Sequence, residues 1–214
     1  MLFCTLLPIF LLLGHYLITE ARHCIGDIEG TLPTRLPFAV VLMTLFAGVA
    51  SFVSTRGILL GQSWLLVLRD LLLLGWSVLL TQLDVARGWL PFRNTGGLIF
   101  SGLLFSLLPQ APVPFLQAMR EGGVMFLGLS LFRGWVNRHG VERFGLGDVY
   151  LLSGLSLWLT LPVTASLTLW ALGFVVLHVV AGKRGVVPQV RDIPFAPYLC
   201  GCLAVAILMQ PLPG

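Results

Sequence analysis

The sequence predicts an all-α, polytopic membrane protein with about eight transmembrane helices. Of its 214 residues, 57% are hydrophobic and only 10% are charged. Soluble domains carry about a quarter charged residues, so this composition is typical of an integral membrane protein. The apolar stretches are long and continuous, whereas the strands of a membrane barrel alternate over segments of about 10 residues. Helices are therefore favoured over a barrel.

Eight apolar runs, separated by polar or proline-rich segments, predict the helices. The first run has neither the basic start nor the small-x-small site of a cleaved signal peptide, so we expect a retained helix. Arg56 and Gly57 are expected to end the second helix. The predicted spans are residues 2–19, 38–54, 58–83, 96–108, 121–136, 148–161, 163–181 and 195–210. We divide the chain into an N-terminal two-helix segment, residues 1–56, and a six-helix core, residues 57–214.

The basic residues are distributed unevenly between the expected loops. The loops after the first, third, fifth and seventh spans contain Arg22, Arg35, Arg87, Arg93, Arg133, Arg138, Arg143, Lys183, Arg184 and Arg191. The loops after the other spans contain Arg56 alone. The positive-inside rule therefore predicts that the first set lies in the cytoplasm and that both termini lie outside it. Because the net charge of +4 is spread over short loops, the expected partner is a lipid bilayer and not nucleic acid.

Several other polar residues are predicted to have structural roles. The four cysteines are Cys4, Cys24, Cys200 and Cys202. They form no CxxC pair and have no histidine at ligand spacing, so we expect neither a metal site nor a disulfide framework. Arg69-Asp70 and Arg120-Glu121 are interpreted as ion pairs toward the outer side of the membrane. His15 is expected to be buried and hydrogen-bonded among the helices.

Two aspartates lie at the predicted cytoplasmic face, where Asp84 closes the third span and Asp148 opens the sixth. Two carboxyl groups close together in a poorly hydrated site cannot both ionise easily, so they share a proton. One carboxylate can then act as a base that activates water, while the other protonates a scissile carbonyl. The alternative is that Asp148 only caps a helix and that Asp84 is a solvated loop residue.

Helix position predicts a role for each aspartate. Asp148 at a helix N-terminus is in a field that favours its anion, whereas Asp84 near a helix C-terminus is in the opposite field. Asp148 is therefore predicted to be the base and Asp84 the protonated acid. The assignment weakens if the third helix continues through residues 85–87, whose sequence permits a helix.

Three segments together resemble the type IV prepilin peptidases, which are membrane aspartic proteases of the GxGD type. Gly145-Leu146-Gly147-Asp148-Val149 matches the GxGD-V motif of that family. Leu83-Asp84, with Leu90-Pro91 following six residues after the aspartate, matches a second family pattern. Residues 193–199 read IPFAPYL and are similar to the family's IPFGPFL opening of the last span.

The resemblance implies an aspartic-type endopeptidase that removes the short basic leader of type IV prepilins or pseudopilins. Cleavage after a glycine would occur at the cytoplasmic face of a bacterial inner membrane. The implied catalytic residues are Asp84 and Asp148, with motif support from Gly145, Gly147, Pro91 and Pro194. Neither a metal nor another cofactor is expected. Which prepilin is cleaved, whether a pilus or a type II secretion system is served, and the oligomeric state are left open.

The sequence departs from the family pattern in three places. Phe92 stands where the family often has aspartate after Leu-Pro, and Tyr150 stands where it usually has lysine after GxGD-V. Bifunctional members also carry paired CxxC motifs in a long first loop and N-methylate the mature pilin with S-adenosylmethionine. Here that loop is only about residues 20–37 and contains Cys24 alone. We therefore expect a peptidase without the methyltransferase, with S-adenosylmethionine a cofactor only if that activity remains.

Two other functions are weighed against the peptidase. A proton-coupled transporter would use Asp84 and Asp148 as titratable sites, but transporters place such residues near the membrane midplane and often contain internal repeats. This chain shows no repeat, and both acids lie at the membrane edge. An inactive assembly factor of a pilus or secretion system is the other alternative, motivated by Phe92 and Tyr150.

Overall fold

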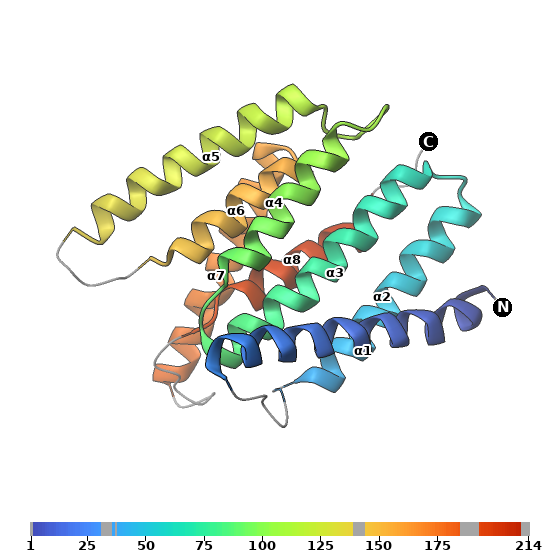
Figure 1. The fold of residues 1–214 in the computed structure, drawn as a ribbon, viewed down its shortest axis with the longest axis horizontal. Helices are drawn as coiled ribbons and strands as arrows, with labels where there is room; N and C mark the ends of the chain where they lie inside the picture. Colours follow the sequence, from blue (N-terminus) through green and yellow to red (C-terminus); the bar gives the residue numbers. More distant parts are fainter. Residues whose placement is uncertain (1, 31–35, 37, 139–143, 185–192, 211–214) are drawn as a thin grey trace. The chain divides into compact units, whose positions relative to one another are not determined.

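The structure is a computed structural model that describes residues 2–30, 36, 38–138, 144–184 and 193–210 (Figure 1). These residues form eight α-helices and no strand, which confirms the all-α class. The helices are α1 (Leu2–Glu29), α2 (Ala39–Leu59), α3 (Trp64–Arg87), α4 (Phe92–Ser106), α5 (Phe115–Val136), α6 (Leu146–Trp158), α7 (Leu161–Lys183) and α8 (Ala196–Leu208). Of the basic residues used to predict orientation, Arg35, Arg143 and Arg191 lie outside the described ranges.

Membrane character is evident in the helix lengths and surfaces. Within the described ranges, α1, α2, α3 and α7 are each long and apolar enough to cross a membrane. The helices α4, α6 and α8 contain 15, 13 and 13 residues, fewer than the roughly 20 that usually span the hydrocarbon core. Large apolar side chains such as Leu12, Leu131 and Trp170 are exposed. Such surfaces suit contact with lipid rather than water.

Several predicted helix ends are wrong. The helix α3 begins at Trp64 and not at residue 58, and α5 begins at Phe115 and not at residue 121. The first helix continues to Glu29 and not to residue 19, so the polar segment from Glu20 is helical. The second helix continues through Arg56 and Gly57 to Leu59. A Cβ on Gly57 would lie 2.4 Å from Val67 Cγ2, so this glycine allows close packing of α2 on α3 and does not break the helix.

The side chain of Arg56 is also accommodated within the fold. Its Nη1 and Nη2 atoms donate hydrogen bonds to the carbonyl oxygens of Leu208 and Gln210, at 2.9 and 2.6 Å. The last carbonyls of a helix lack intrahelical donors. The guanidinium group therefore satisfies the C-terminal end of α8, which explains why a charged residue is tolerated inside α2.

The helices form two compact units, Met1–Gly88 with Ala196–Gly214, and Trp89–Phe195. In the first unit α3 contacts α1, α2 and α8; in the second, α6 contacts α4, α5 and α7. Nine of the thirteen residues of α6 are buried. Among them, Trp158 donates a hydrogen bond from Nε1 to the Leu98 carbonyl oxygen at 3.0 Å. The division at residue 56 predicted from the sequence stays a prediction.

The two predicted ion pairs are confirmed. Arg69 donates from Nε and Nη2 to Asp70 Oδ1 at 2.9 and 2.7 Å. Arg120 Nη2 lies 3.5 Å from Glu121 Oε1, which also accepts from Gln117. The second oxygen of Glu121 accepts from the Leu161 N–H at the start of α7. Both acids therefore have partners within the fold, and Glu121 also connects α5 to α7.

Candidate active site

Asp84 lies in the last turn of α3, and its side chain is buried within the first unit. Gly88 adopts the left-handed conformation (φ 69°) that commonly ends a helix, and its N–H donates to the Asp84 carbonyl oxygen. The carboxylate oxygen Oδ2 of Asp84 accepts a hydrogen bond of 2.8 Å from the backbone N–H of Ala196. With 6% of its surface exposed, Asp84 is not the solvated loop residue of the alternative interpretation.

The donor to Asp84 comes from the third motif. Ala196 is the first residue of α8, directly after the segment that contains Pro194. The first N–H groups of a helix have no intrahelical acceptor, and they make the N-terminus a region of positive potential. A carboxylate at this position satisfies one of these donors. Sequence comparison identified both motifs, but the contact between them is visible only in the structure.

Asp148 is the third residue of α6, which confirms its predicted place in the first turn of the sixth helix, and its side chain is half-buried. Gly145, the residue before the helix, has ordinary extended angles (φ −73°, ψ 146°). A Cβ there would meet only Asp148 Oδ2, at 3.4 Å. Neither the backbone angles nor the surroundings of Gly145 therefore require a glycine at this position.

The positions of the two aspartates remove the basis for their predicted roles. Asp148 lies in the first turn of α6, and Asp84 accepts a hydrogen bond from the first turn of α8. The helix α3 also continues past Asp84 to Arg87. Both carboxyl groups thus lie at a helix N-terminus, so the field of the helices does not separate a base from an acid.

Gly147 brings two motifs together within the second unit. A Cβ on Gly147 would lie 2.9 Å from Leu90 Cβ and 3.2 Å from the Leu90 carbonyl oxygen. The absence of a side chain at Gly147 therefore allows the Leu90-Pro91 segment to lie directly against the first turn of α6. Pro91 is buried and immediately precedes α4, where its carbonyl oxygen accepts from the Asn94 N–H at 3.0 Å.

Asn137, a residue not selected from the sequence, holds the segment that leads to Asp148. Its Nδ2 atom donates to the Phe144 carbonyl oxygen at 2.9 Å, and its Oδ1 atom accepts from the Phe144 N–H at 3.1 Å. The Phe144 ring also contacts Phe132 of α5, with ring centroids 5.6 Å apart. The only feature of the sequence that could have predicted this pair of hydrogen bonds is an asparagine directly after α5.

The two departures from the family pattern contact each other. The rings of Phe92 and Tyr150 meet edge to face, with centroids 5.1 Å apart. The ring of Phe126 of α5 stacks on that of Tyr150, with centroids 6.0 Å apart. Aromatic pairs of this geometry contribute roughly 0.5–1.5 kcal/mol beyond the area they bury. The two substitutions therefore affect a single contact between the start of α4 and the first turns of α6.

The residues of the candidate site are divided between the two units. Asp84 and Ala196 belong to the first unit, whereas Asp148, Gly145, Gly147, Pro91 and Pro194 belong to the second. Within the described residues, no group of three or more histidine, cysteine, aspartate or glutamate side chains is arranged to hold a metal ion. The fold and these residues define an all-α membrane protein that carries an aspartate at each of two helix termini.

Comparison with known proteins identifies the family. Residues 71–184 match the model of the type IV leader peptidase family, so both aspartates lie inside the match and Ala196 lies beyond it. The chain belongs to this family. No solved structure matches.

Three curated relatives illustrate the similarity. A type 4 prepilin-like proteins leader peptide-processing enzyme of Escherichia coli is 27% identical over 176 residues, which cover 81% of this chain and 61% of the relative. A prepilin leader peptidase/N-methyltransferase of Aeromonas salmonicida is 30% identical over 84% of this chain and 60% of the relative. The leader peptidase HopD of Escherichia coli is 35% identical over 58% of this chain and 81% of the relative. The chain thus spans about 60% of the length of the first two.

Proposed function

We propose that this chain is a prepilin leader peptidase that uses Asp84 and Asp148 as its catalytic pair. The observation that carries the proposal is the Asp84 carboxylate, which is buried at the end of α3 and accepts a hydrogen bond from the third family motif. A solvated acid would need no such donor. The match to the leader peptidase family and the names of the relatives support the same activity.

The proposed reaction is hydrolysis of one peptide bond by general acid–base catalysis. One aspartate accepts a proton from water, whose oxygen attacks the scissile carbonyl carbon, while the other donates a proton to the carbonyl oxygen. Collapse of the tetrahedral intermediate breaks the C–N bond and transfers a proton to the leaving amine. The proposal requires no metal or other cofactor. It does not include N-methylation, for which S-adenosylmethionine would be needed.

The proposed membrane arrangement follows from the charge pattern and helix lengths. We propose that all eight helices cross a bacterial inner membrane, the shorter ones by local thinning of the bilayer. The basic loops, and with them Asp84 and Asp148, would face the cytoplasm. This arrangement places the acids at the membrane edge, where the basic leader of a prepilin meets its hydrophobic helix.

We propose that an apolar groove near Asp84 receives a side chain from the hydrophobic helix of the substrate. Its volume is about 220 Å³, and α2, α3 and α8 line it. It begins beside Thr81, one turn before Asp84, and beside Pro197, the residue after Ala196. Further along α8, Gly201 and Ala204 line the wall. Small residues allow close approach of another helix in a membrane.

Filling this groove is expected to impair cleavage without loss of folded protein. A Cβ on Gly201 has nothing within 4 Å, so Gly201→Leu adds a side chain in open space. We expect a reduction of roughly tenfold, since excluding a docked helix side chain costs about 1–3 kcal/mol. The measurement is the cleaved fraction of a co-expressed prepilin per amount of peptidase. The control is Gly173→Leu on α7, which is equally open; equal effects of the two substitutions would contradict the groove.

Removal of the donor to Asp84 tests the contact between the motifs. Ala196→Pro suits the first position of a helix, eliminates the N–H and places the ring Cδ where its hydrogen was, so the Asp84 carboxylate must also move away. A hydrogen bond to a charged group is worth about 1.5–3 kcal/mol, so cleavage should fall roughly 10- to 100-fold. Ala196→Gly retains the N–H and should keep most of the activity. If the proline and glycine variants cleave equally well, the hydrogen bond to Asp84 is unimportant for catalysis.

The proposal itself is tested by cleavage of a panel of co-expressed type IV prepilins and pseudopilins in membranes that contain the wild-type chain. The expected product has lost its leader after a glycine, as determined by mass spectrometry of its N-terminus. Substitution of that glycine in the substrate should abolish the product. Failure to process any member of the panel, with the peptidase present and folded, would overturn the proposal.

A further inference from the structure

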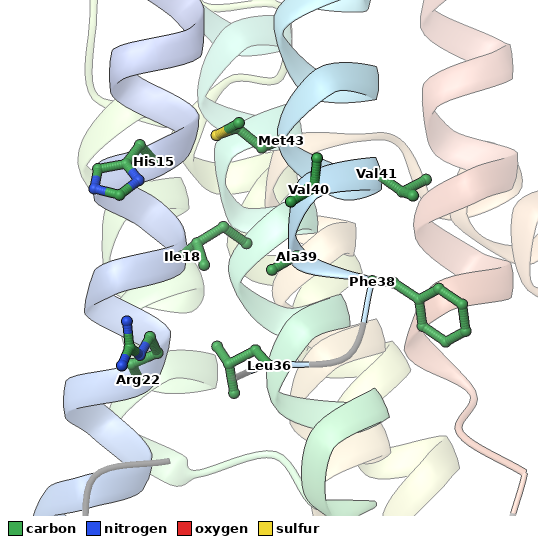
Figure 2. Close-up of a pocket in the computed structure, with 9 residues that line it drawn as sticks. All are labelled: His15, Ile18, Arg22, Leu36, Phe38, Ala39, Val40, Val41 and Met43. Carbon is green, nitrogen blue, oxygen red and sulfur yellow. The ribbon is translucent and has the colours of Figure 1, made fainter. Parts of the chain in front are cut away.

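A second, larger groove lies between α1 and the beginning of α2, and its lining residues differ from those of the first groove. Its volume is about 520 Å³ (Figure 2). From α1 it is lined by His15, Ile18 and Arg22, and from the segment that opens α2 by Phe38, Val40 and Met43, among others. Figure 2 shows Arg22 at one end of the groove, and Ile18, Ala39 and Met43 between the two helices.

The charged and the apolar residues that line the groove lie at different positions along the axis of α1. Residues 15, 18 and 22 share one face of α1, because side chains three, four and seven positions apart lie above one another. Arg22 is about 10 Å from His15 along the axis, at 1.5 Å per residue. Contrary to the expectation from sequence, His15 is exposed, and it lies against this groove.

The position of the groove places Arg22 near a membrane surface. The last turns of α1, the first turns of α2 and the last turns of α3 lie at the same end of the first unit (Figure 1). Arg22 follows the apolar run of residues 2–19 within α1, and positive residues that flank such a run lie near headgroup depth. The wall formed by Ile18, Val40 and Met43 continues along α1 and α2, two helices long and apolar enough to cross the membrane. A ligand here would contact cationic and apolar surfaces at once.

We propose that this groove binds one anionic phospholipid. The guanidinium group of Arg22 binds the lipid phosphate, for which its planar, forked N–H groups are well suited. One acyl chain lies against Ile18, Val40 and Met43. Anionic lipids are recognised by basic pockets between membrane helices on the cytoplasmic side, the side predicted for this end of α1. The proposal is independent of the peptidase activity.

The test is native mass spectrometry of the purified full-length chain in detergent. Phosphatidylglycerol and phosphatidylcholine with identical acyl chains are offered at equal concentrations. We expect one phosphatidylglycerol to remain bound with at least about tenfold preference, and Arg22→Gln to lower that preference about tenfold. The control is Arg184→Gln, which removes an exposed arginine outside the groove and should retain the preference. Ala39→Trp, which fills the groove, should reduce binding of both lipids.

Two further arms make the outcome decisive. Arg22→Lys retains the positive charge and should retain most of the preference, which also covers the case that Arg22→Gln does not fold. Glycerol 3-phosphate, which has the phosphate without acyl chains, should not displace the lipid at equal concentration. Equal binding of the two lipids by the wild type, equal losses in the Arg22→Gln and Arg184→Gln variants, or displacement by glycerol 3-phosphate would each overturn the proposal.

Discussion

Asp84→Asn and Asp148→Asn are each expected to reduce leader cleavage by about 10²- to 10⁴-fold, the usual contribution of a general acid or base. Asparagine has the size of aspartate but neither accepts a proton from water nor donates one to a carbonyl oxygen. At Asp84 the amide can still accept the hydrogen bond from the Ala196 N–H through its oxygen. The fold should therefore persist. The measurement is the cleaved fraction of a co-expressed prepilin at equal amounts of folded peptidase.

Asp70→Asn is the matched control for these substitutions. Asp70 is buried in the same helix as Asp84, but its carboxylate pairs with Arg69. Loss of this pair affects stability rather than chemistry, so cleavage per folded molecule should stay within about threefold of the wild type. Retained processing in the Asp84 or Asp148 variant would remove that aspartate from the mechanism. Loss of cleavage in all three variants would mean that the effect is not specific to Asp84 and Asp148.

Gly147→Ala is expected to reduce cleavage by at least about tenfold, although the substitution adds only one methyl group. The added Cβ would lie 2.9 Å from Leu90 Cβ and 3.2 Å from the Leu90 carbonyl oxygen. Because one neighbour is backbone, the Leu90-Pro91 segment or the first turn of α6 must move. Overpacking of this kind costs about 1–3 kcal/mol. The displacement affects Asp148 directly, since it is the next residue.

The neighbouring motif glycine provides the control. In Gly145→Ala the new methyl group would meet only Asp148 Oδ2, at 3.4 Å, and the backbone angles at Gly145 suit any residue. We expect cleavage within about threefold of the wild type. Both variants are compared by prepilin cleavage and by thermal unfolding in detergent. If Gly145→Ala is as damaging as Gly147→Ala, close packing on Leu90 is not the reason for the glycine at 147.

The local sequence predicted the positions of the helices better than it predicted their ends. The apolar runs predicted where each helix lies because the requirement for about 20 apolar residues acts along the chain. Polar residues at the ends of these runs were misread. Glu20 was expected in a loop but continues α1, and Arg56 was expected to end α2 but binds carbonyl oxygens of Leu208 and Gln210. In both cases a helix tolerates a polar residue near a membrane boundary.

The sequence by itself determined the all-α membrane class, the two aspartates and the motifs around them, because hydrophobicity and motif spacing are properties of the linear chain. Only the tertiary structure revealed the donor to Asp84, which lies 112 residues away. A backbone N–H exists at nearly every residue, so no residue type marks the one that will meet a carboxylate. The packing of Leu90 on Gly147 likewise depends on two segments meeting in space. These contacts between distant segments, rather than residue identities, determine how each aspartate is held.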